Sequence, residues 1–294
     1  MNLNQKSCSI LKKLIEKEDI DVIEYDTDHG TVFLIDFGIK NEFHEDVGEK
    51  IAKVCMGSLG SVKINDNEIY VKIPKNPSIA TMSCQMAGWS IKLNRINALG
   101  SGPARILAKK PSSIIERIGY HEKSDRALLI LELETDVFPS VNVCRNILIE
   151  TEANELYIPI FKIKSTTGLI NIMARVVEVG IFRLYNLDYD INGIRYAEGR
   201  CIIPELDDDI MFKSNDAIIY NGRVKIEVNE WNPELAERAI FSSSKFYGKS
   251  FREIFEQCGC DFYNINPDIF APAVLEVEDI SSGEVYRAGK CHSP

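Results

Sequence analysis

The chain has 294 residues, of which 45% are hydrophobic and 27% are charged. These values are typical of a globular protein with a substantial buried core, and the length fits one large domain or two of ordinary size. The formal net charge of −10 argues against a nucleic-acid partner held by overall charge, although it is compatible with a local basic pocket.

The sequence gives no sign of a membrane segment or a metal site. It contains no uncharged apolar run of about 18 residues, the length that a membrane-spanning helix needs. Its first residues form a charged amphipathic pattern unlike a signal peptide, so a cytoplasmic location is expected. The eight cysteines are scattered, with no CxxC pair, and the four histidines are isolated from one another. We therefore expect reduced, mostly buried thiols and no bound metal.

Hydrophobic periodicity predicts alternating helices and hairpins in the first third of the chain. The elements expected there are helices at 3–17, 45–57 and 78–87, and strands at 21–26, 31–38, 61–66, 68–74 and 89–93.

The rest of the chain continues the alternation. The elements expected there are strands at 126–134, 155–163, 273–280 and 283–289, helices at 139–148, 168–187 and 248–257, and a hairpin over 217–229 that turns on Asn221-Gly222. Because several strands are joined as hairpins, the pattern favours an α/β fold with α+β-like mixed sheets over a doubly wound parallel sheet. A domain boundary is placed near residues 164–168.

The stretch NALGSGPARILAKKP, residues 97–111, places two glycines beside a proline and a basic residue. Gly100 and Gly102 permit unusual backbone angles, and Pro103 suits the first turn of a helix. A helix that begins there directs free amides back toward the glycines, and Arg105 adds a positive charge. A plain helix start and an anion-binding site both fit this pattern, and the residues alone favour the plain helix start.

A second stretch, INIMARVVEVGIF at 170–182, is apolar apart from Arg175 and Glu178. Three residues apart, the two side chains share one face of a helix. They form either a surface ion pair of small energetic value or an enclosed pair that keeps a carboxylate ionised in a dry cleft. The apolar residues on nearly every side indicate that the segment is largely enclosed, but the pattern does not separate a functional role of the pair from a structural one.

A third stretch, at 247–273, ends in NPDIFAPA, where two prolines constrain a loop that presents Phe270. An aromatic side chain on such a loop either stacks on a planar ligand or fills the core.

Taken together, the three stretches resemble the methenyltetrahydromethanopterin cyclohydrolase family. QMAGW at 85–89 and LGSGPAR at 99–105 match the family's Gln-Lys-Ala-Gly-Trp and Met-Gly-Ser-Gly-Pro-Ala-Arg segments. ARVVEVG at 174–180 matches its Ala-Arg-Val-Val-Glu-Thr-Gly helix. FYGKSF and DFYNINPDIFAPA match its C-terminal block, in the same order and at similar spacing.

The resemblance implies two α/β domains, 1–165 and 166–294, with an interdomain cleft, and a homotrimer. It also implies an enzyme that hydrolyses N5,N10-methenyl-tetrahydromethanopterin to the N5-formyl compound without a metal or other cofactor. Arg175 and Glu178 match the family's catalytic pair. Glu178 is expected to orient the attacking water and receive its proton, while Arg175 fixes the carboxylate and keeps it ionised.

The resemblance further implies a substrate-binding set. Its members are Gln85, Gly100, Ser101, Gly102, Arg105, Asn215, Asp216 and Phe270. The chain departs from the family at Met86, where the family has a pocket lysine, in the segments 199–206 and 212–216, and at Ser58 and Gly60, where small residues are replaced. Lys213 or Arg200 would restore a positive charge. These departures leave open a paralogue that acts on another one-carbon pterin and a non-catalytic pterin-binding protein.

Overall fold

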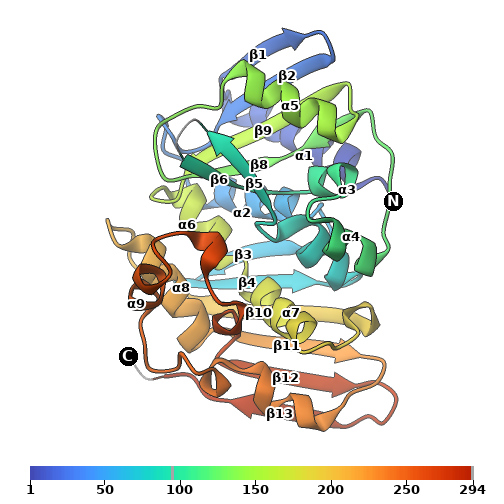
Figure 1. Ribbon diagram of the computed structural model, residues 1–294, viewed down its shortest axis with the longest axis vertical. Helices are drawn as coiled ribbons and strands as arrows, with labels where there is room; N and C mark the ends of the chain where they lie inside the picture. Colours follow the sequence, from blue (N-terminus) through green and yellow to red (C-terminus); the bar gives the residue numbers. More distant parts are fainter. Residues whose placement is uncertain (94–95, 293–294) are drawn as a thin grey trace. The chain divides into compact units, whose positions relative to one another are not determined.

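The computed structural model describes residues 1–93 and 96–292 (Figure 1). The chain forms two compact units, the first made of residues 1–61 and 79–171 and the second of residues 62–78 and 172–294. The break after residue 171 lies close to the expected boundary, but the sequence did not indicate that residues 62–78 belong with the second unit. That the two units are separate domains stays a prediction.

The first unit is built on a seven-stranded mixed sheet. Its strands are β1 (Val22–Thr27), β2 (Gly30–Asp36), β5 (Trp89–Leu93), β6 (Ile96–Ser101), β7 (Arg126–Leu128), β8 (Ile130–Leu133) and β9 (Glu155–Lys162). The strand order is β1-β2-β9-β8-β6-β5, and β7 pairs with β9. Strand β9 runs parallel to β2, β7 and β8, whereas the β1-β2 and β5-β6 hairpins are antiparallel. The expected mixture of parallel and antiparallel pairing is confirmed.

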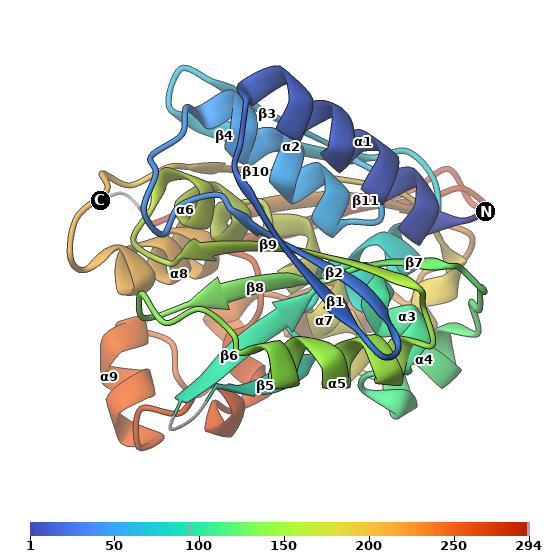
Figure 2. The same ribbon diagram turned by 90° about the horizontal axis from the view of Figure 1, so that it is seen from above.

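Helices cover both faces of this sheet (Figure 2). They are α1 (Leu3–Glu18), α2 (Glu45–Cys55), α3 (Ala104–Ala108), α4 (Ser112–Ile118), α5 (Val141–Thr151) and the π-helical turn η1 (Ile79–Gln85). Leu11 of α1 and Val47 of α2 share one apolar cluster with Phe161, and Ile147 of α5 shares another with Ile158. Because β9 supplies side chains to both clusters, it is apolar on both faces, which explains the unbroken apolar run in its sequence.

The second unit is built on a six-stranded sheet, also mixed. Its strands are β3 (Ser61–Asn65), β4 (Glu68–Ile73), β10 (Ile194–Ile202), β11 (Arg223–Val228), β12 (Val274–Asp279) and β13 (Val285–Gly289), in the order β13-β12-β11-β10-β4-β3. Strands β11 and β12 are parallel, and β10 is antiparallel to both β4 and β11.

Helices α7 (Val176–Asn186) and α8 (Ile210–Asn221) contact β10. The remaining helices of this unit are α9 (Phe251–Gln257) and the short 3-10 turns Ile191–Gly193, Pro233–Leu235, Glu237–Ala239, Phe241–Ser243, Phe262–Asn264 and Pro267–Ile269. Gly199 of β10 has no room for a side chain, because a Cβ there would lie 2.8 Å from Val177 of α7. On strand β10, Arg200 and the other side chains that point away from α7 are partly or fully exposed.

The hairpin predicted at Asn221-Gly222 is wrong. The residues before this pair belong to α8, Gly222 is the C-cap of that helix, and β11 starts at Arg223. Asn and Gly are favoured at helix C-termini as well as in hairpin turns, so the pair alone did not distinguish the two. Strands β6 and β10 were not predicted.

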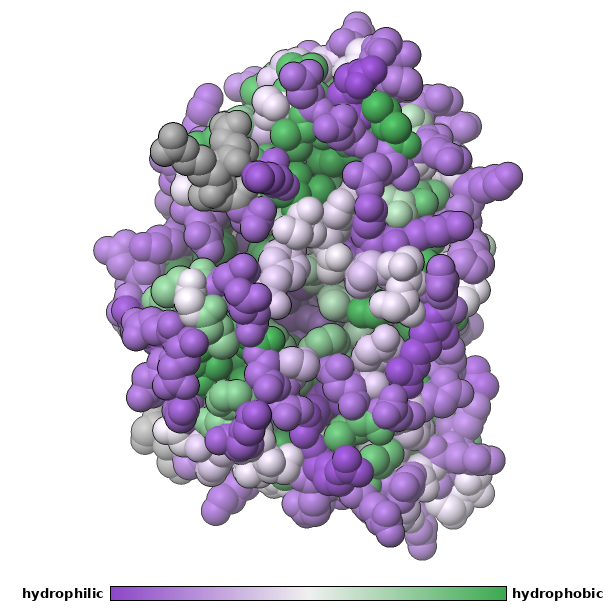
Figure 3. Space-filling view, in the orientation of Figure 1, coloured by the Kyte–Doolittle hydropathy of each residue, from purple (hydrophilic) through white to green (hydrophobic). Residues whose placement is uncertain are grey.

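Within the part of the chain that the structure describes, no helix is long and apolar enough to cross a membrane. Hydrophilic side chains predominate on the face shown in Figure 3, with apolar side chains in smaller groups among them. All eight cysteines are free thiols, and five of them are buried, as expected from their scattered spacing.

Candidate active site

The predicted Arg175–Glu178 pair lies where two helices meet. Helix α6 (Thr166–Met173) ends two residues before Arg175, which is the N-cap of α7 with φ −78° and ψ 0°. The amide of Arg175 donates to the carbonyl of Ile172, and its carbonyl accepts from the amide of Val179, both at 2.9 Å. The single helix predicted over 168–187 is therefore wrong at this point, where a tight turn separates two helices.

Glu178 lies in the first turn of α7. Its Oε2 lies 3.9 Å from Nη1 of Arg175, and the two side chains are only 10% and 12% exposed, respectively. The structure thus selects the enclosed ion pair over the surface pair. The partial positive charge at the start of a helix stabilises a carboxylate in its first turn, and low exposure strengthens both attractions.

The same helix holds the loop that presents Phe270. Nη1 of Arg183 donates to Asp268 in that loop. The ring of Phe182 packs edge-on against Phe270, with 6.0 Å between the ring centroids. Because residues four apart share a helix face, Phe270 lies on the side of α7 that bears Glu178. Phe270 and the ion pair are therefore gathered around one helix.

Asn215 and Asp216 lie on α8 and are bonded within the second unit. Nδ2 of Asn215 donates to the carbonyl of Met211 at 2.8 Å. The carboxylate of Asp216 accepts the amide of Phe251 at 2.7 Å and so anchors the first residue of α9. Burial raises the pKa of Asp216 above its ordinary value. These bonds hold Asn215 and Asp216 to α8 and to the start of α9.

In the first unit, hydrogen bonds from Arg105 connect the GSGPAR segment to the main chain around QMAGW. Its guanidinium is fully buried. Nη1 donates to the carbonyls of Met82, Cys84 and Met86 at 3.0, 3.3 and 2.8 Å, and Nε donates to the carbonyl of Lys110 at 2.8 Å. These contacts bind the GSGPAR segment to the π-helical turn before QMAGW.

Gly88 of QMAGW is required by the same arrangement. A Cβ at this position would lie 2.4 Å from Nη2 of Arg105 and 2.7 Å from Cδ of Pro111. The glycine therefore lets the guanidinium pass close to the backbone.

The other predicted members in the first unit are enclosed as well. Gly100 and Ser101 end strand β6, and Gln85 ends the π-helical turn. Gln85 and Ser101 are fully buried, and the hydroxyl of Ser101 accepts from the thiol of Cys55 at 3.3 Å. Gly102 adopts φ +104°, and its amide donates to the carbonyl of Cys84 at 2.7 Å.

Helix α3, which follows, has five residues, and the amides of its second and third residues already have carbonyl partners. The amide of Arg105 donates to the carbonyl of Gly102, and the amide of Ile106 to that of Pro103. This geometry is that of a plain helix start, which the residues alone favoured over an anion site.

The positions that depart from the family pattern lie in different places. Met86 is partly buried, and its carbonyl is one of the acceptors for Arg105. Lys213 is exposed and pairs with Asp207. Arg200 points away from α7, on the opposite face of its sheet from that helix, so it does not lie beside the Arg175–Glu178 pair.

A buried carboxylate in the first unit was missed from the sequence. Glu132 of β8 is 3% exposed, and its Oε2 accepts from Nδ2 of the fully buried Asn171 at 3.4 Å. Buried ionisable side chains are frequent at functional sites. The available signal was a lone acidic residue inside the apolar run LILEL.

The geometry of the ion pair supports acid–base chemistry. An enclosed carboxylate that is positioned by a guanidinium in the first turn of a helix has the chemistry of a general base toward water. Within residues 1–93 and 96–292, no three His, Cys, Asp or Glu side chains are grouped as a metal site requires. That the chemistry needs no metal or cofactor stays a prediction.

The protein is thus an α/β protein with two units, each built on a mixed sheet. Its candidate acid–base site is the enclosed Arg175–Glu178 pair at the start of a helix. The family model described as "Cyclohydrolase (MCH)" matches residues 2–294. The chain belongs to this cyclohydrolase family, which confirms the resemblance read from its motifs.

Curated relatives match over the whole length. The methenyltetrahydromethanopterin cyclohydrolase of Methanocaldococcus jannaschii is 36% identical, with 100% of this chain and 96% of the relative covered. The proteins of the same name from Methanothermobacter thermautotrophicus and Methanothermobacter marburgensis are each 35% identical, with 98% of this chain and 96% of the relative covered.

Proposed function

We propose that this protein is a cyclohydrolase that converts N5,N10-methenyl-tetrahydromethanopterin to N5-formyl-tetrahydromethanopterin. Support comes from the family match over residues 2–294 and from the names of relatives that align over nearly their full length. The observation that carries the chemistry is the enclosed Arg175–Glu178 pair at the start of α7.

The reaction is the addition of water to a cation followed by ring opening. The methenyl carbon is bonded to two nitrogens that share a positive charge, so it is electrophilic. The oxygen of a water molecule attacks this carbon while Glu178 takes one proton from the water. The bond between the carbon and N10 then breaks, N10 takes up a proton, and the hydroxyl loses its proton to become the formyl carbonyl. One water is consumed, and one proton leaves Glu178 for solvent.

The two members of the pair have different roles in this proposal. Bulk water is a poor nucleophile at neutral pH, and a positioned base accelerates such a step by about 10² to 10⁴. Glu178 supplies this base, and its negative charge also complements the cationic substrate. Arg175 holds the carboxylate in position and keeps it ionised, so that it is ready to accept a proton.

The predicted binding residues fall into two groups. Phe270 keeps its proposed role of contacting the planar pterin, because its loop is held against the face of α7 that bears Glu178. For Arg105 we propose a supporting role instead, since its guanidinium is buried among backbone carbonyls. Gln85 and Ser101, which are also fully buried, are assigned to the same supporting framework.

Several parts of the proposal rest on the resemblance or the sequence alone. They are substrate contact by Gly100, Gly102, Asn215 and Asp216, the cleft between domains, the homotrimeric state and the cytoplasmic location.

The test follows the loss of methenyl-tetrahydromethanopterin absorbance with wild type, Glu178→Gln and Arg175→Gln. Glu178→Gln is expected to lower kcat by about 10² to 10⁴, with a smaller change in KM, because the amide cannot accept the proton. Glu256→Gln makes the same chemical change at an exposed position of α9 and serves as the matched control.

The outcomes separate the alternatives. If wild type binds the pterin but gives no rate above buffer, the protein is a binding protein. If it is inactive on this pterin and active on another one-carbon pterin, it is the paralogue. Full activity of Glu178→Gln would remove Glu178 from the role of base.

A further inference from the structure

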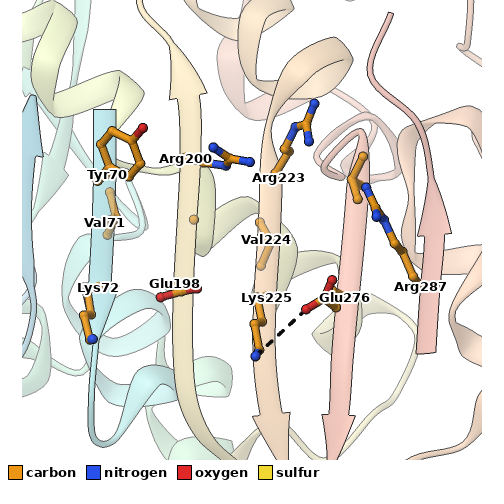
Figure 4. Close-up of a pocket in the computed structure, with 12 residues that line it drawn as sticks. Tyr70, Val71, Lys72, Glu198, Arg200, Arg223, Val224, Lys225, Glu276 and Arg287 are labelled. Carbon is orange, nitrogen blue, oxygen red and sulfur yellow. Dashed lines mark ion pairs between the residues drawn. The ribbon is translucent and has the colours of Figure 1, made fainter. Parts of the chain in front are cut away.

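A hollow of about 550 Å³ lies on the face of the second unit's sheet that points away from α7 (Figure 4). Five strands line it, β4 and β10 to β13, and its charged side chains are Lys72, Glu198, Arg200, Arg223, Lys225, Glu276 and Arg287. Five basic residues thus face two carboxylates in a protein whose formal net charge is −10. The volume is in the range of sites for small molecules.

The strand register sorts these charges into two rows. In one row, charges of opposite sign lie side by side on successive strands: Lys72 opposite Glu198, Glu198 opposite Lys225, Lys225 opposite Glu276, and Glu276 opposite Arg287. Cross-strand neighbours of opposite charge stabilise a sheet. The two carboxylates of this row balance two of its three cations, and Glu276 pairs with Lys225, so Arg287 at the end of the row is left without a balancing charge.

The neighbouring row is different. It consists of Tyr70, Arg200, Arg223, Val274 and Gly289 in register. Arg200 and Arg223 are therefore direct cross-strand neighbours of like charge, with side-chain origins about 5 Å apart, an arrangement that destabilises a sheet unless an anion lies between the two side chains. The row itself contains no carboxylate.

Of the three arginines that line the hollow, only Arg200 has a carboxylate within ion-pair distance among the described residues. Glu68 lies 3.5 Å from Nη1 of Arg200 and also accepts the hydroxyl of Tyr70. Among the residues that the structure describes, Arg223 and Arg287 make no ion pair within 4.0 Å. In Figure 4, Arg200 and Arg223 lie at one end of the hollow, and the side chain of Arg287 extends from the level of Glu276 toward that end.

We propose that this hollow is a binding site for a small molecule that carries a diphosphate group. The guanidinium fork matches the geometry of phosphate oxygens and binds them through two parallel hydrogen bonds. Arg200 and Arg223 lie on adjacent strands and Arg287 lies two strands beyond Arg223, so the three reach more than one phosphoryl group.

The surroundings favour a small anion over a long polyanion. Beyond the alternating row, the next in-register row places Glu227 opposite Glu278. These carboxylates limit the positive region to the hollow, and they would repel a nucleic-acid backbone that extended past it.

The hollow is separate from the Arg175–Glu178 pair. Gly199 of β10 packs against Val176 and Val177, so α7 lies on the other face of this sheet from the exposed Arg200. The proposal therefore does not depend on the proposed cyclohydrolase activity.

The test is calorimetric titration of the full-length protein, without pterin, with inorganic pyrophosphate, orthophosphate and sulfate. We expect one pyrophosphate site per chain and markedly weaker binding of the two single anions. Arg223→Gln and Arg287→Gln should each weaken pyrophosphate binding by at least about tenfold, because each removes charge-assisted hydrogen bonds. Arg195→Gln removes the same charge from β10 at a residue outside the hollow and should change the affinity by less than about twofold.

Thermal unfolding without pyrophosphate shows whether the variants fold. Arg223→Gln should unfold at the wild-type temperature or slightly above it, because it relieves repulsion from Arg200. Glu178→Gln should bind pyrophosphate like the wild type.

The proposal is overturned by no pyrophosphate binding, by equal affinity for sulfate, or by equal weakening in Arg195→Gln. Loss of pyrophosphate binding in Glu178→Gln would contradict the separation of the two sites. If wild type binds no pyrophosphate and Arg223→Gln changes the sedimentation coefficient, this face is instead an interface between copies of the chain.

Discussion

Replacing Arg105 distinguishes a supporting role from contact with the substrate. The guanidinium is fully buried and donates to four backbone carbonyls, those of Met82, Cys84, Met86 and Lys110. The substitution Arg105→Met would leave these four buried carbonyls without the hydrogen-bond donor that Arg105 supplies. Removing one partner of a buried charged network costs about 3–5 kcal/mol, a large part of the ~5–15 kcal/mol that stabilises a typical protein.

Lysine at this position keeps the charge but lacks the planar fork. Its ammonium cannot reach both the carbonyl of Lys110 and the three carbonyls of the π-helical turn, so we expect Arg105→Lys to cost about 2 kcal/mol. Gly88→Ala acts on the same contact from the other side, because its Cβ would lie 2.4 Å from Nη2 of Arg105. It should destabilise the protein in the same direction.

The assay is equilibrium urea unfolding followed by circular dichroism, together with KM and kcat for the pterin. Arg145→Lys is the matched control, since Arg145 makes a two-point contact with Asp28 at the surface. Exposed pairs contribute little, so its unfolding midpoint should not change. If Arg105→Lys unfolds at the wild-type midpoint and raises KM more than about tenfold, Arg105 contacts the substrate and the supporting role is wrong.

Two further predictions concern ionisation. Burial raises the pKa of Asp216 above 3.8, so the folded protein holds this proton more firmly than the unfolded chain, and the resulting stability is lost as the pH rises through the folded-state pKa. Asp216→Asn removes the buried charge, and its amide oxygen still accepts from the amide of Phe251. It should therefore raise the thermal midpoint relative to wild type at pH 7 but not at pH 3, where the wild-type carboxyl holds its proton. An equal effect at both pH values would contradict this reasoning. Burial also raises the pKa of Cys8 to about 12 and that of Cys84 well above 9.0, whereas Cys260 is exposed. Titration with a thiol reagent at pH 8 should show one fast thiol that Cys260→Ser removes, and a fast phase that survives this change would refute the assignment.

The elements that the sequence predicted best are those with one long apolar face. Helix α1 buries Leu3, Cys8, Leu11 and Leu14 at helical spacing, and its predicted range agrees with the observed one. The hairpins β1-β2 and β12-β13 follow the predicted turns because their strands alternate and short polar segments join them.

Strand β10 was missed for a physical reason. The residues that it buries near its centre, Ala197, Gly199 and Cys201, are small because α7 and α8 contact this strand. Small side chains are only weakly hydrophobic, so the sequence of this strand does not show the alternation of apolar and polar residues by which a strand is predicted. Strand β6 also contains a residue without a side chain, for a different reason: a Cβ on Gly100 would lie 2.6 Å from the carbonyl oxygen of Trp89 in the paired strand β5.

The candidate site was predicted in part. The spacing of Arg175 and Glu178 and the apolar residues around them indicated a shared face and low exposure, and the 3.9 Å pair agrees with both. The helix break before Val176 was not indicated, because the apolar pattern continues through it. The partners of Arg105 could not be predicted from the sequence, because they are main-chain carbonyls. The direction of these carbonyls depends on the π-helical turn and not on the identity of the side chains.

This dependence on main-chain atoms bears on the departure at position 86. Met86 replaces the family's lysine, yet its contribution to the Arg105 network is its carbonyl, which any residue provides. The first unit therefore keeps the same framework with either side chain. The substitution removes one positive charge and keeps this carbonyl contact, so under the proposed function we expect it to affect the choice of pterin and not the fold. Arg175 and Glu178 contact each other within the first turn of α7, in the other unit from Met86, so we expect the substitution at position 86 to leave the proposed role of Glu178 as base unchanged.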